Sequence, residues 1–273
     1  MAGEKFAITP EQIKELQEAT LMDDDFMREF FRGNIPGVQK VLQIIMNKPD
    51  LIVKSVSVQH NLPGFGEFHG VRFDVYAIDS EGRQYDIEFQ NDSDGADPHR
   101  ADFNSAMMTV RTLKKGEDYS ILAERERVVI FITKTDVLKG GLPLYTVKRV
   151  ISETGKPFND GVLILYVNTS LKDTATALGK LIHDFRCRNT NDWYYADMAE
   201  HAEEVRKENV YMKSWQARVE EVAKEVAKEV EAITYENVAL SLIRRGKDAF
   251  EEIAKLCHLT LERVQELAAT VQS

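Results

Sequence analysis

The stretch RFDVYAIDSEGRQYDIEFQ (residues 72–90) decides the fold, because it predicts two β-strands joined by a tight turn. Apolar and polar residues alternate on both sides of DSEG (79–82), and Gly82 suits the left-handed position of a three-residue hairpin loop. A loop that ends at Gly82 places Asp74 opposite Glu88 on the neighbouring strand.

In this register the alternation of side chains gives the hairpin two different faces. One face is apolar or aromatic and is expected to pack on a core: Phe73, Val75, Ala77, Tyr85, Ile87 and Phe89. The other face is polar and is expected to be exposed to solvent: Asp74, Tyr76, Gln84, Asp86, Glu88 and Gln90. A slip of one residue would both expose the apolar set and separate Asp74 from Glu88, so the two features support the same register.

The polar face suggests a metal site. Two carboxylates held side by side repel each other unless a cation lies between them. Oxygen ligands suit Mg²⁺ or Mn²⁺, so Asp74 and Glu88 are candidate ligands. Gln90, on the same face, is a candidate to position a water by hydrogen bonding, without the positive charge of a lysine. The alternative, that these residues simply face solvent, stays open on the pattern alone.

Composition fits a globular chain of 273 residues with one sizeable core and a smaller appendage. The polar N-terminus lacks the apolar segment of a secretory signal, and no run is long enough to cross a bilayer, so we expect a cytoplasmic protein without a membrane partner. Cys187 and Cys257 have no CxxC spacing and are expected to be reduced thiols. The net charge of −10 argues against nucleic-acid binding through bulk positive charge, so any such contact needs a local basic surface.

The remaining elements predict the α/β class, with a mixed sheet flanked by helices. The continuous apolar run RVVIFITK (127–134) is typical of a central parallel strand that is buried on both faces. Further strands are expected in 51–60, 144–151 and 162–168. Helices are expected within 10–47, over about 100–115 and over 171–185, with a helical pattern throughout from Asp192 onward.

Beyond these patterns, FDVYAIDSEGRQYDIEFQ (73–90) resembles the core motif of the PD-(D/E)XK nucleases, in which an Asp precedes an (Asp/Glu)-x-Lys strand. More narrowly, it is similar to the PD-(D/E)XK nuclease-family transposases, which are related to the recombination-promoting nucleases and in which glutamine commonly replaces the lysine. The likeness covers roughly residues 20–190 and includes DDDFMREFF (23–31), PHRADFNSAM (98–107), KKGEDYSIL (114–122), VVIFITKTDVLKGGLPLY (128–145) and LGKLIHDFRC (178–187). RRGKDAFEEIAKLCHLTLERVQEL (244–267) is similar to the helical tail of these proteins.

The resemblance implies a restriction-endonuclease-like fold and divalent-metal-dependent DNA cleavage, linked to recombination or mobile elements. It implies that Asp74 and Glu88 are metal ligands and that Gln90 occupies the lysine position. The resulting hypothesis adds the Phe89 carbonyl as a third ligand to Mg²⁺ (or Mn²⁺). Phe73 stands where the motif has proline, and Gln90 leaves activation of the attacking water more dependent on the metal. DNA and RNA are not distinguished, because the phosphate is common to both.

Two residues after the hairpin are weaker candidates. Arg100 corresponds to a basic position of the family motif and could hold a substrate phosphate. Alternatively, it is a surface arginine paired with Asp97 or Asp102. His99 is a candidate general base, although an exposed histidine is the plainer interpretation.

Three acidic residues are candidate accessory groups. Glu29 or Asp25, on the first predicted helix, would contribute to the metal site, whereas capping of that helix by residues 23–25 is the alternative. Asp86 would accept a hydrogen bond beside the site, whereas simple solvent exposure explains it equally well.

The chain is predicted to have three parts: a nuclease-like domain (1–190), a helical connector (191–233) and a small helical hairpin (234–273), which together give an all-α C-terminal extension. Valines at 219, 222, 226 and 230 form one face of an amphipathic helix, a candidate surface for homo-oligomer formation.

In the tail, Thr260 is a predicted N-cap between two short helices. The last helix carries Glu262 and Glu266 and is not basic, so a packing or oligomer-forming hairpin is favoured over a DNA-binding helix-turn-helix. A catalytically degenerate nuclease-fold module that acts through this tail is the alternative to an endonuclease.

Overall fold

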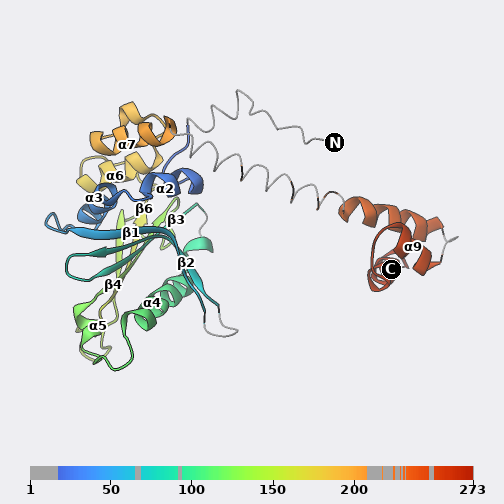
Figure 1. Cartoon of the computed structure of the whole chain (residues 1–273), viewed down its shortest axis with the longest axis horizontal. Helices are drawn as coiled ribbons and strands as arrows, with labels where there is room; N and C mark the ends of the chain where they lie inside the picture. Colours follow the sequence, from blue (N-terminus) through green and yellow to red (C-terminus); the bar gives the residue numbers. More distant parts are fainter. Residues whose placement is uncertain are drawn as a thin grey trace. The chain divides into compact units, whose positions relative to one another are not determined.

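The computed structural model describes residues 18–64, 69–91, 94–207, 232–245 and 249–272, together with 217, 224, 228 and 230. The chain forms two compact units, Met1–Met212 and Lys213–Ser273, and each is described by itself (Figure 1). The first unit contains the hairpin.

The first unit is built on a six-stranded mixed sheet with the strand order β1-β2-β3-β4-β6-β5. The strands are β1 (Val53–Leu62), β2 (Val71–Asp79), β3 (Gln84–Gln90), β4 (Arg127–Thr133), β5 (Leu144–Val147) and β6 (Val162–Asn168). β3, β4 and β6 are parallel, whereas the β1–β2, β2–β3 and β5–β6 pairs are antiparallel. The predicted mixed sheet of the α/β class is therefore confirmed.

β4 is the centre of the sheet. It lies between β3 and β6, parallel to both, and all its residues are buried. Neither face of β4 meets water, which explains why its sequence is a continuous apolar run rather than an alternation. The expectation for this strand is confirmed.

Helices cover both faces of the sheet (Figure 1). One face is covered by α2 (Asp24–Phe31), α3 (Ile35–Ile45), α6 (Ala177–Arg186) and α7 (Ala196–Lys207), and the other by α4 (Pro98–Thr112). Short elements complete the unit: η1 (Asp94–Ala96), α5 (Ile121–Glu124) and η2 (Thr190–Asp192). On the four-helix side the ring of Phe89 lies 5.6 Å from that of Phe31 and 5.7 Å from that of Phe185. The hairpin strands β2 and β3 are thus enclosed between two helical layers.

The hairpin has the predicted register. Val75 pairs with Ile87 and Tyr76 pairs with Asp86, the alignment that a three-residue loop requires. The N–H of Asp79 donates to the Arg83 carbonyl at 3.1 Å, and Gly82 has a φ of +81°. The left-handed conformation at Gly82 is the one that glycine adopts without steric cost.

Two elements are shorter than expected. β5 ends at Val147 rather than continuing to 151. α6 begins at Ala177 rather than at 171, because Thr176 caps it: the Thr176 side chain accepts a hydrogen bond from the Gly179 N–H at 3.0 Å.

The segment after Asp192 is not helical throughout, in contrast to the prediction. A non-helical link separates η2 from α7 because the buried Asp184 carboxylate accepts the backbone N–H groups of Tyr194, at 2.9 Å, and Tyr195, at 3.0 Å. α7 belongs to the first unit: His201 donates to the Phe30 carbonyl at 3.0 Å. The first unit therefore extends past the boundary suggested at residue 190.

The described part of the second unit is helical. Residues 232–245 form a helix, followed by α9 (Phe250–Leu256) and α10 (Leu261–Gln272). Their shared core consists of Ala239, Ile253, Ala254, Cys257, Val264 and Leu267. Thr260 Oγ1 accepts the Arg263 N–H at 3.2 Å, so the predicted N-cap is confirmed. Positions 219, 222 and 226 of the valine face lie outside the described residues, and Val230 is exposed.

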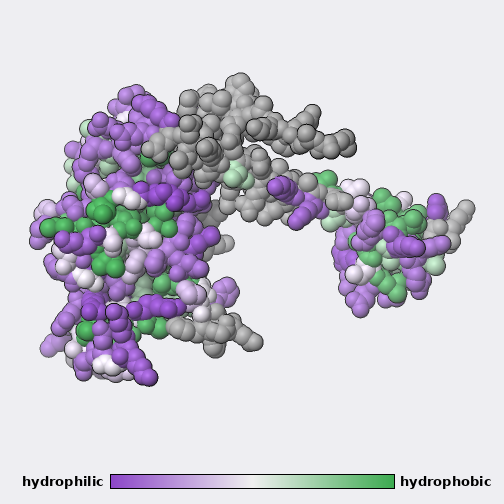
Figure 2. Space-filling model, in the orientation of Figure 1, coloured by the Kyte–Doolittle hydropathy of each residue, from purple (hydrophilic) through white to green (hydrophobic). Residues whose placement is uncertain are grey.

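Among the described residues, none of the helices combines the length and the apolar composition that crossing a membrane requires. In Figure 2 the visible face of the first unit is mostly hydrophilic, with hydrophobic residues gathered over β1. Because β1 is the first strand of the sheet, this hydrophobic band lies at a sheet edge.

Candidate active site between β2 and β3

β2 and β3 separate where the two motif carboxylates lie. Backbone pairing between the strands ends at Val75 and Ile87, although both strands continue. Beyond that pair, the carboxylates accept backbone N–H groups from the opposite strand. Asp74 Oδ2 accepts the Phe89 N–H at 3.1 Å, and Glu88 Oε1 accepts the Asp74 N–H at 3.3 Å. The sequence-predicted pair, Asp74 and Glu88, is therefore brought together at the point of separation.

The separation also changes the direction of Phe73. Strict alternation places Phe73 with Val75 on the four-helix side of the sheet. Instead, the Phe73 ring lies 5.9 Å from the ring of Tyr76 and joins the α4-side cluster that contains Phe131 and Tyr166. The prediction for Phe73 is wrong, because the strict alternation of β2 breaks where its pairing with β3 ends, although Phe73 remains paired with His60 of β1.

The polar face of β3 is buried, so the expectation that it faces solvent is wrong. Glu88 and Asp86 are both 0% exposed. Three polar pairs connect this face to α4, and together they form the β3–α4 seam: Gln84 with Thr112 at 2.8 Å, Asp86 with Asn104 at 2.9 Å, and Glu88 with Arg100. The sequence contains a signal for this seam that the prediction of an exposed polar face did not use. Polar residues at 100, 104 and 112 are spaced by multiples of four and so share one face of a helix.

Arg100 binds Glu88 and not the acidic residues of its own helix. Its Nη2 donates to Glu88 Oε2, its Nη1 donates to the Gly95 carbonyl at 2.8 Å, and its side chain remains 37% exposed. Asp102 pairs instead with Arg149 at 2.9 Å, and the Asp97 carboxylate accepts a backbone N–H of its own helix. The alternative of a surface pair of Arg100 with Asp97 or Asp102 is wrong, because the carboxylate of Glu88 lies within reach.

Gln90 is held beside the carboxylates. Its Nε2 donates to Glu88 Oε2 at 3.2 Å. A Cβ added at Gly95 would lie 2.1 Å from Gln90 Oε1, so the absence of a side chain at Gly95 lets η1 approach the amide. Gln90 is therefore a neutral donor in direct contact with Glu88.

Burial and mutual repulsion destabilise the ionised form of the site carboxyls. Burial, together with the charge of Asp74, raises the pKa of Glu88 to about 7, against the opposing effect of Arg100. Burial also raises the pKa of Asp74, and the charge of Asp24 in the first turn of α2 adds to this effect. Such a cluster favours a cation, and its perturbed acids are typical of functional sites.

Asp86 lies beside Glu88 and is fully buried, so its solvent-exposed interpretation is wrong. Its Oδ2 accepts Nδ2–H of Asn104 at 2.9 Å. Burial, followed by the charge of Glu88, raises the pKa of Asp86 well above its usual range, and a protonated Asp86 donates to Glu88. Asp86 is thus a buried neighbour of Glu88 that contacts α4 through Asn104.

The other accessory candidates lie elsewhere. Glu29 is buried and pairs with Arg32 through two hydrogen bonds of 2.9 Å. Asp25 pairs with Arg28 at 3.0 Å. His99 is exposed. The α2 residue that acts on Asp74 electrostatically is Asp24, which sequence reasoning did not single out.

The raised pKa values predict how stability depends on pH when metal is absent. The pKa of Glu88 rises from 4.5 to about 7 on folding. The folded chain therefore binds this proton more tightly, and the stability it contributes is complete below 4.5 and lost as the pH rises through about 7. In EDTA, the free energy of unfolding by urea should fall between about pH 5 and about pH 8, and Glu88→Gln should reduce that fall by up to about 3 kcal/mol. Identical pH profiles for the two proteins would contradict this assignment.

The donors suit a hard divalent ion. Within the residues that the structure describes, no group of three or more His, Cys, Asp or Glu side chains is arranged to hold a metal. Asp74 and Glu88 supply two carboxylates, and Mg²⁺ is usually bound by one or two carboxylates together with waters and substrate phosphate. The crowding of buried acids at this point, only partly neutralised by Arg100, fits such an ion.

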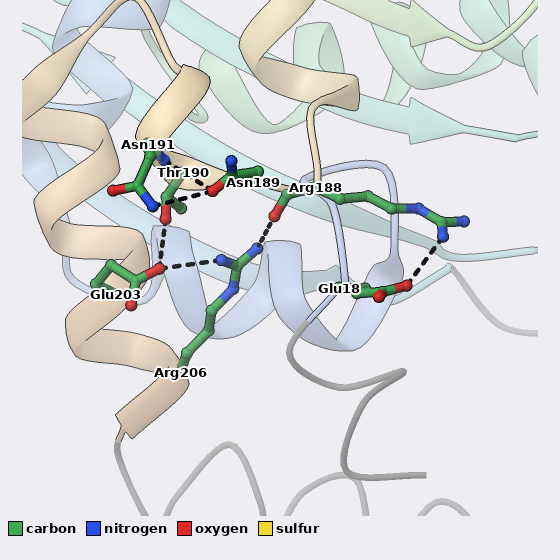
Figure 3. A pocket seen from close by; sticks show the side chains of 7 residues that line it. All are labelled: Glu18, Arg188, Asn189, Thr190, Asn191, Glu203 and Arg206. Carbon is green, nitrogen blue, oxygen red and sulfur yellow. Dashed lines mark hydrogen bonds and ion pairs between the residues drawn. The ribbon is translucent and has the colours of Figure 1, made fainter. Parts of the chain in front are cut away.

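A polar cavity of about 560 Å³ shares no residue with this site (Figure 3). It is lined by Glu18, Arg188, Asn189, Thr190, Asn191, Glu203 and Arg206. Arg206 donates to the Ala19 carbonyl at 2.8 Å and to the Arg188 carbonyl at 2.9 Å, and it pairs with Glu203 at 3.1 Å. These contacts connect the segment before α2 to α7 and give the cavity wall a structural role.

Because the cavity wall is accounted for by structural contacts, the carboxylate pair is the stronger candidate for chemistry. Asp74 and Glu88 occupy the end of the β2–β3 ladder, and Gln90 and Arg100 both contact Glu88. Comparisons of this chain with protein-family models, with curated proteins and with solved structures find no match, so the function must be inferred from this site and from the sequence.

Proposed function

We propose that the chain is a divalent-metal-dependent endonuclease that hydrolyses DNA phosphodiesters, with a restriction-endonuclease-like sheet. The observation that carries the proposal is the meeting of Asp74 and Glu88 where β2 leaves β3, with Gln90 in contact with Glu88. The resemblance to the PD-(D/E)XK nuclease-family transposases and to the recombination-promoting nucleases supports the same activity and suggests a role in recombination.

Each residue of the site has a separate task in this proposal. Asp74, Glu88 and the Phe89 carbonyl would hold Mg²⁺ or Mn²⁺. Once bound, the ion would lower the pKa of a water and stabilise charge on the attacked phosphate. Gln90 orients the attacking water through its amide, and Arg100, 37% exposed, supplies a guanidinium for a phosphate oxygen.

The substrate must be held by local positive charge, because the chain has a net charge of −10. Arg72 is exposed on β2 next to Asp74. Arg100 and Arg111 lie three helical turns apart on α4, and so share one face of that helix. Arg72 and Arg100 offer basic contacts close to the carboxylates, and Arg111 would extend these contacts along the helix, about 16 Å from Arg100, where a phosphate backbone would pass.

A nicking assay tests the proposal. Supercoiled plasmid DNA is incubated with the full chain in Mg²⁺, in Mn²⁺ and in EDTA, and an RNA of matched length is treated in the same way. We expect nicking in either metal and none in EDTA, and cleavage of the RNA alone would reassign the substrate. Absence of metal-dependent cleavage of both nucleic acids would refute the proposed activity.

Gln90→Lys is expected to increase the rate of cleavage. A lysine at this position places an ammonium beside Glu88, where it adds positive charge for the attacked phosphate, and we expect a gain of roughly 10- to 100-fold. Gln90→Met, of similar size but without a hydrogen-bond donor, is the matched control and should cleave more slowly than wild type. Equal initial rates for the Lys and Met variants would show that this position does not act on the reacting groups.

A second candidate function is a catalytically degenerate nuclease-fold module that acts through its helical tail. The presence of neutral Gln90 and the pairing of Glu88 with Arg100 favour it. In the tail, Ile233 and Leu256 are 60% and 64% exposed, which suits association with another copy of the chain. This function requires that calorimetry detect no metal binding and that sedimentation velocity detect an oligomer that a chain ending at residue 212 does not form.

A further inference from the structure

Glu88 already has a cationic partner. Its Oε2 accepts Nη2 of Arg100 and Nε2 of Gln90, the latter at 3.2 Å, and its Oε1 accepts the Asp74 N–H at 3.3 Å. Both oxygens of Glu88 are therefore occupied by donors from the chain itself. A carboxylate oxygen has two acceptor sites, and Arg100 and Gln90 take both sites of Oε2, so an ion that binds through Oε2 must displace one of them.

Arg100 is the partner that is free to leave. Glu88 is 0% exposed and fixed on a central strand, whereas the Arg100 side chain is 37% exposed and has a long flexible stem. Its other contacts are a single hydrogen bond of 2.8 Å to the Gly95 carbonyl and the ring of Phe131, 5.9 Å from Cζ. Rotation of the stem carries the guanidinium towards solvent without moving the backbone.

The position of Arg100 in its helix disfavours a cation. It lies in the first turn of α4, where the aligned peptide dipoles present partial positive charge and disfavour a cation. A divalent ion between Asp74 and Glu88 would also repel the guanidinium directly. Loss of the Glu88 carboxylate to a metal therefore removes the interaction that holds Arg100 in its position.

We propose that Arg100 is a resident counter-cation of the site, which a divalent ion displaces from Glu88, so that the guanidinium becomes available to a substrate phosphate. This inference rests on the proposed function and adds an order of events to it. In the metal-free chain Arg100 neutralises Glu88, and metal binding exchanges one cation for another. Substrate then meets a site in which metal and guanidinium act on different oxygens of the phosphate.

The proposed displacement of Arg100 predicts that removing this arginine strengthens metal binding. The affinity is measured by calorimetric titration of the full chain with Mn²⁺ at one fixed pH. Arg100→Gln removes the competitor, so its dissociation constant for Mn²⁺ should be roughly 10- to 100-fold lower than that of wild type. Arg100→Lys keeps a competing charge and should remain near wild type. An Arg100→Gln protein that binds Mn²⁺ as weakly as wild type, or more weakly, overturns the inference.

Arg32→Gln is the matched control. Arg32 also pairs with a buried glutamate, Glu29, and it is 55% exposed, but neither residue belongs to the carboxylate site. Its removal should leave the Mn²⁺ affinity unchanged. A comparable gain in Arg32→Gln would show that loss of any arginine raises the affinity, which would also overturn the inference.

Two further measurements separate this inference from the proposed function. In EDTA, Arg100→Gln should unfold at a lower temperature than wild type, because Glu88 has lost its partner, and saturating Mn²⁺ should remove that difference. Binding of a duplex oligonucleotide in Ca²⁺, without cleavage, should be enhanced by the metal in wild type and less so in Arg100→Gln.

If wild type binds Mn²⁺ and cleaves DNA but Arg100→Gln gains no affinity for Mn²⁺, only the proposed displacement of Arg100 fails. If neither protein binds Mn²⁺, both proposals fail.

Discussion

Glu88→Gln is expected to lower the rate of metal-dependent DNA cleavage by about 10³-fold or more, without lowering the stability of the metal-free chain at about pH 8. The amide has nearly the same shape but only one acceptor oxygen, so it can accept from Arg100 or from the Asp74 N–H and not from both, and it brings no negative charge to a metal ion. Stability is retained because Glu88 is 0% exposed and its pKa is raised to about 7, so its ionised form opposes folding at alkaline pH. Initial rates of plasmid nicking in Mn²⁺ and melting temperatures in EDTA measure the two effects.

Glu81→Gln provides the comparison for this substitution. It also removes one carboxylate from the hairpin, but Glu81 is exposed in the turn and pairs only with Arg83, at 2.8 Å. Its cleavage rate should equal that of wild type, and Asp74→Asn should lose activity as Glu88→Gln does. Wild-type rates in both Asp74→Asn and Glu88→Gln would place the chemistry elsewhere in the chain.

Asp79→Ala is expected to destabilise the first unit by about 3–5 kcal/mol. The Asp79 carboxylate is fully buried and accepts four hydrogen bonds: from the backbone N–H groups of Glu81 and Arg83, both at 2.9 Å, from Arg83 Nε at 2.6 Å and from the Tyr85 hydroxyl at 2.8 Å. Its removal leaves Nε of the Arg83 guanidinium and the buried Tyr85 hydroxyl without their acceptor. Urea unfolding followed by circular dichroism gives the change in the free energy of unfolding.

The exposed partner of Arg83 gives the internal comparison. Glu81 contacts the same guanidinium but its side chain is 64% exposed, so Glu81→Ala should change stability by less than about 1 kcal/mol. Equal losses in the two alanine variants would mean that burial of Asp79 does not strengthen the pair. A loss in Asp79→Ala alone would show that this carboxylate fixes the turn, and with it the register that brings Asp74 to Glu88.

The features that the sequence predicted correctly depend on neighbours within about twenty residues of each other. The turn at Gly82 and the apolar alternation of β2 and β3 define one register, and that register sets Asp74 against Glu88. β4 was recognisable because a strand that is buried on both faces carries a continuous apolar run, here Val128 to Ile132. The Thr260 cap is likewise a contact between residues three positions apart.

The features that were missed depend on contacts between distant segments. Alternation shows that Asp86 and Glu88 share a face, but only the position of α4 determines that this face is dry. The partner of Arg100 was missed because Asp97 and Asp102 are close in sequence, whereas Glu88 is close in space. The separation of β2 from β3 has no local signal, because the residues on both sides of it have ordinary strand character.

The β3–α4 seam restricts how this protein can change over evolutionary time. An apolar interface tolerates a substitution of similar size, but each position of the seam matches a particular hydrogen-bond donor to a particular acceptor. Asp86 and Asn104, for example, could exchange identities more easily than either could change alone, because a single change to an apolar residue removes the hydrogen bond that joins these two buried side chains. Correlated replacement of facing residues, rather than invariance at each position, is the pattern that descendants of this chain should show along the helix and the strand.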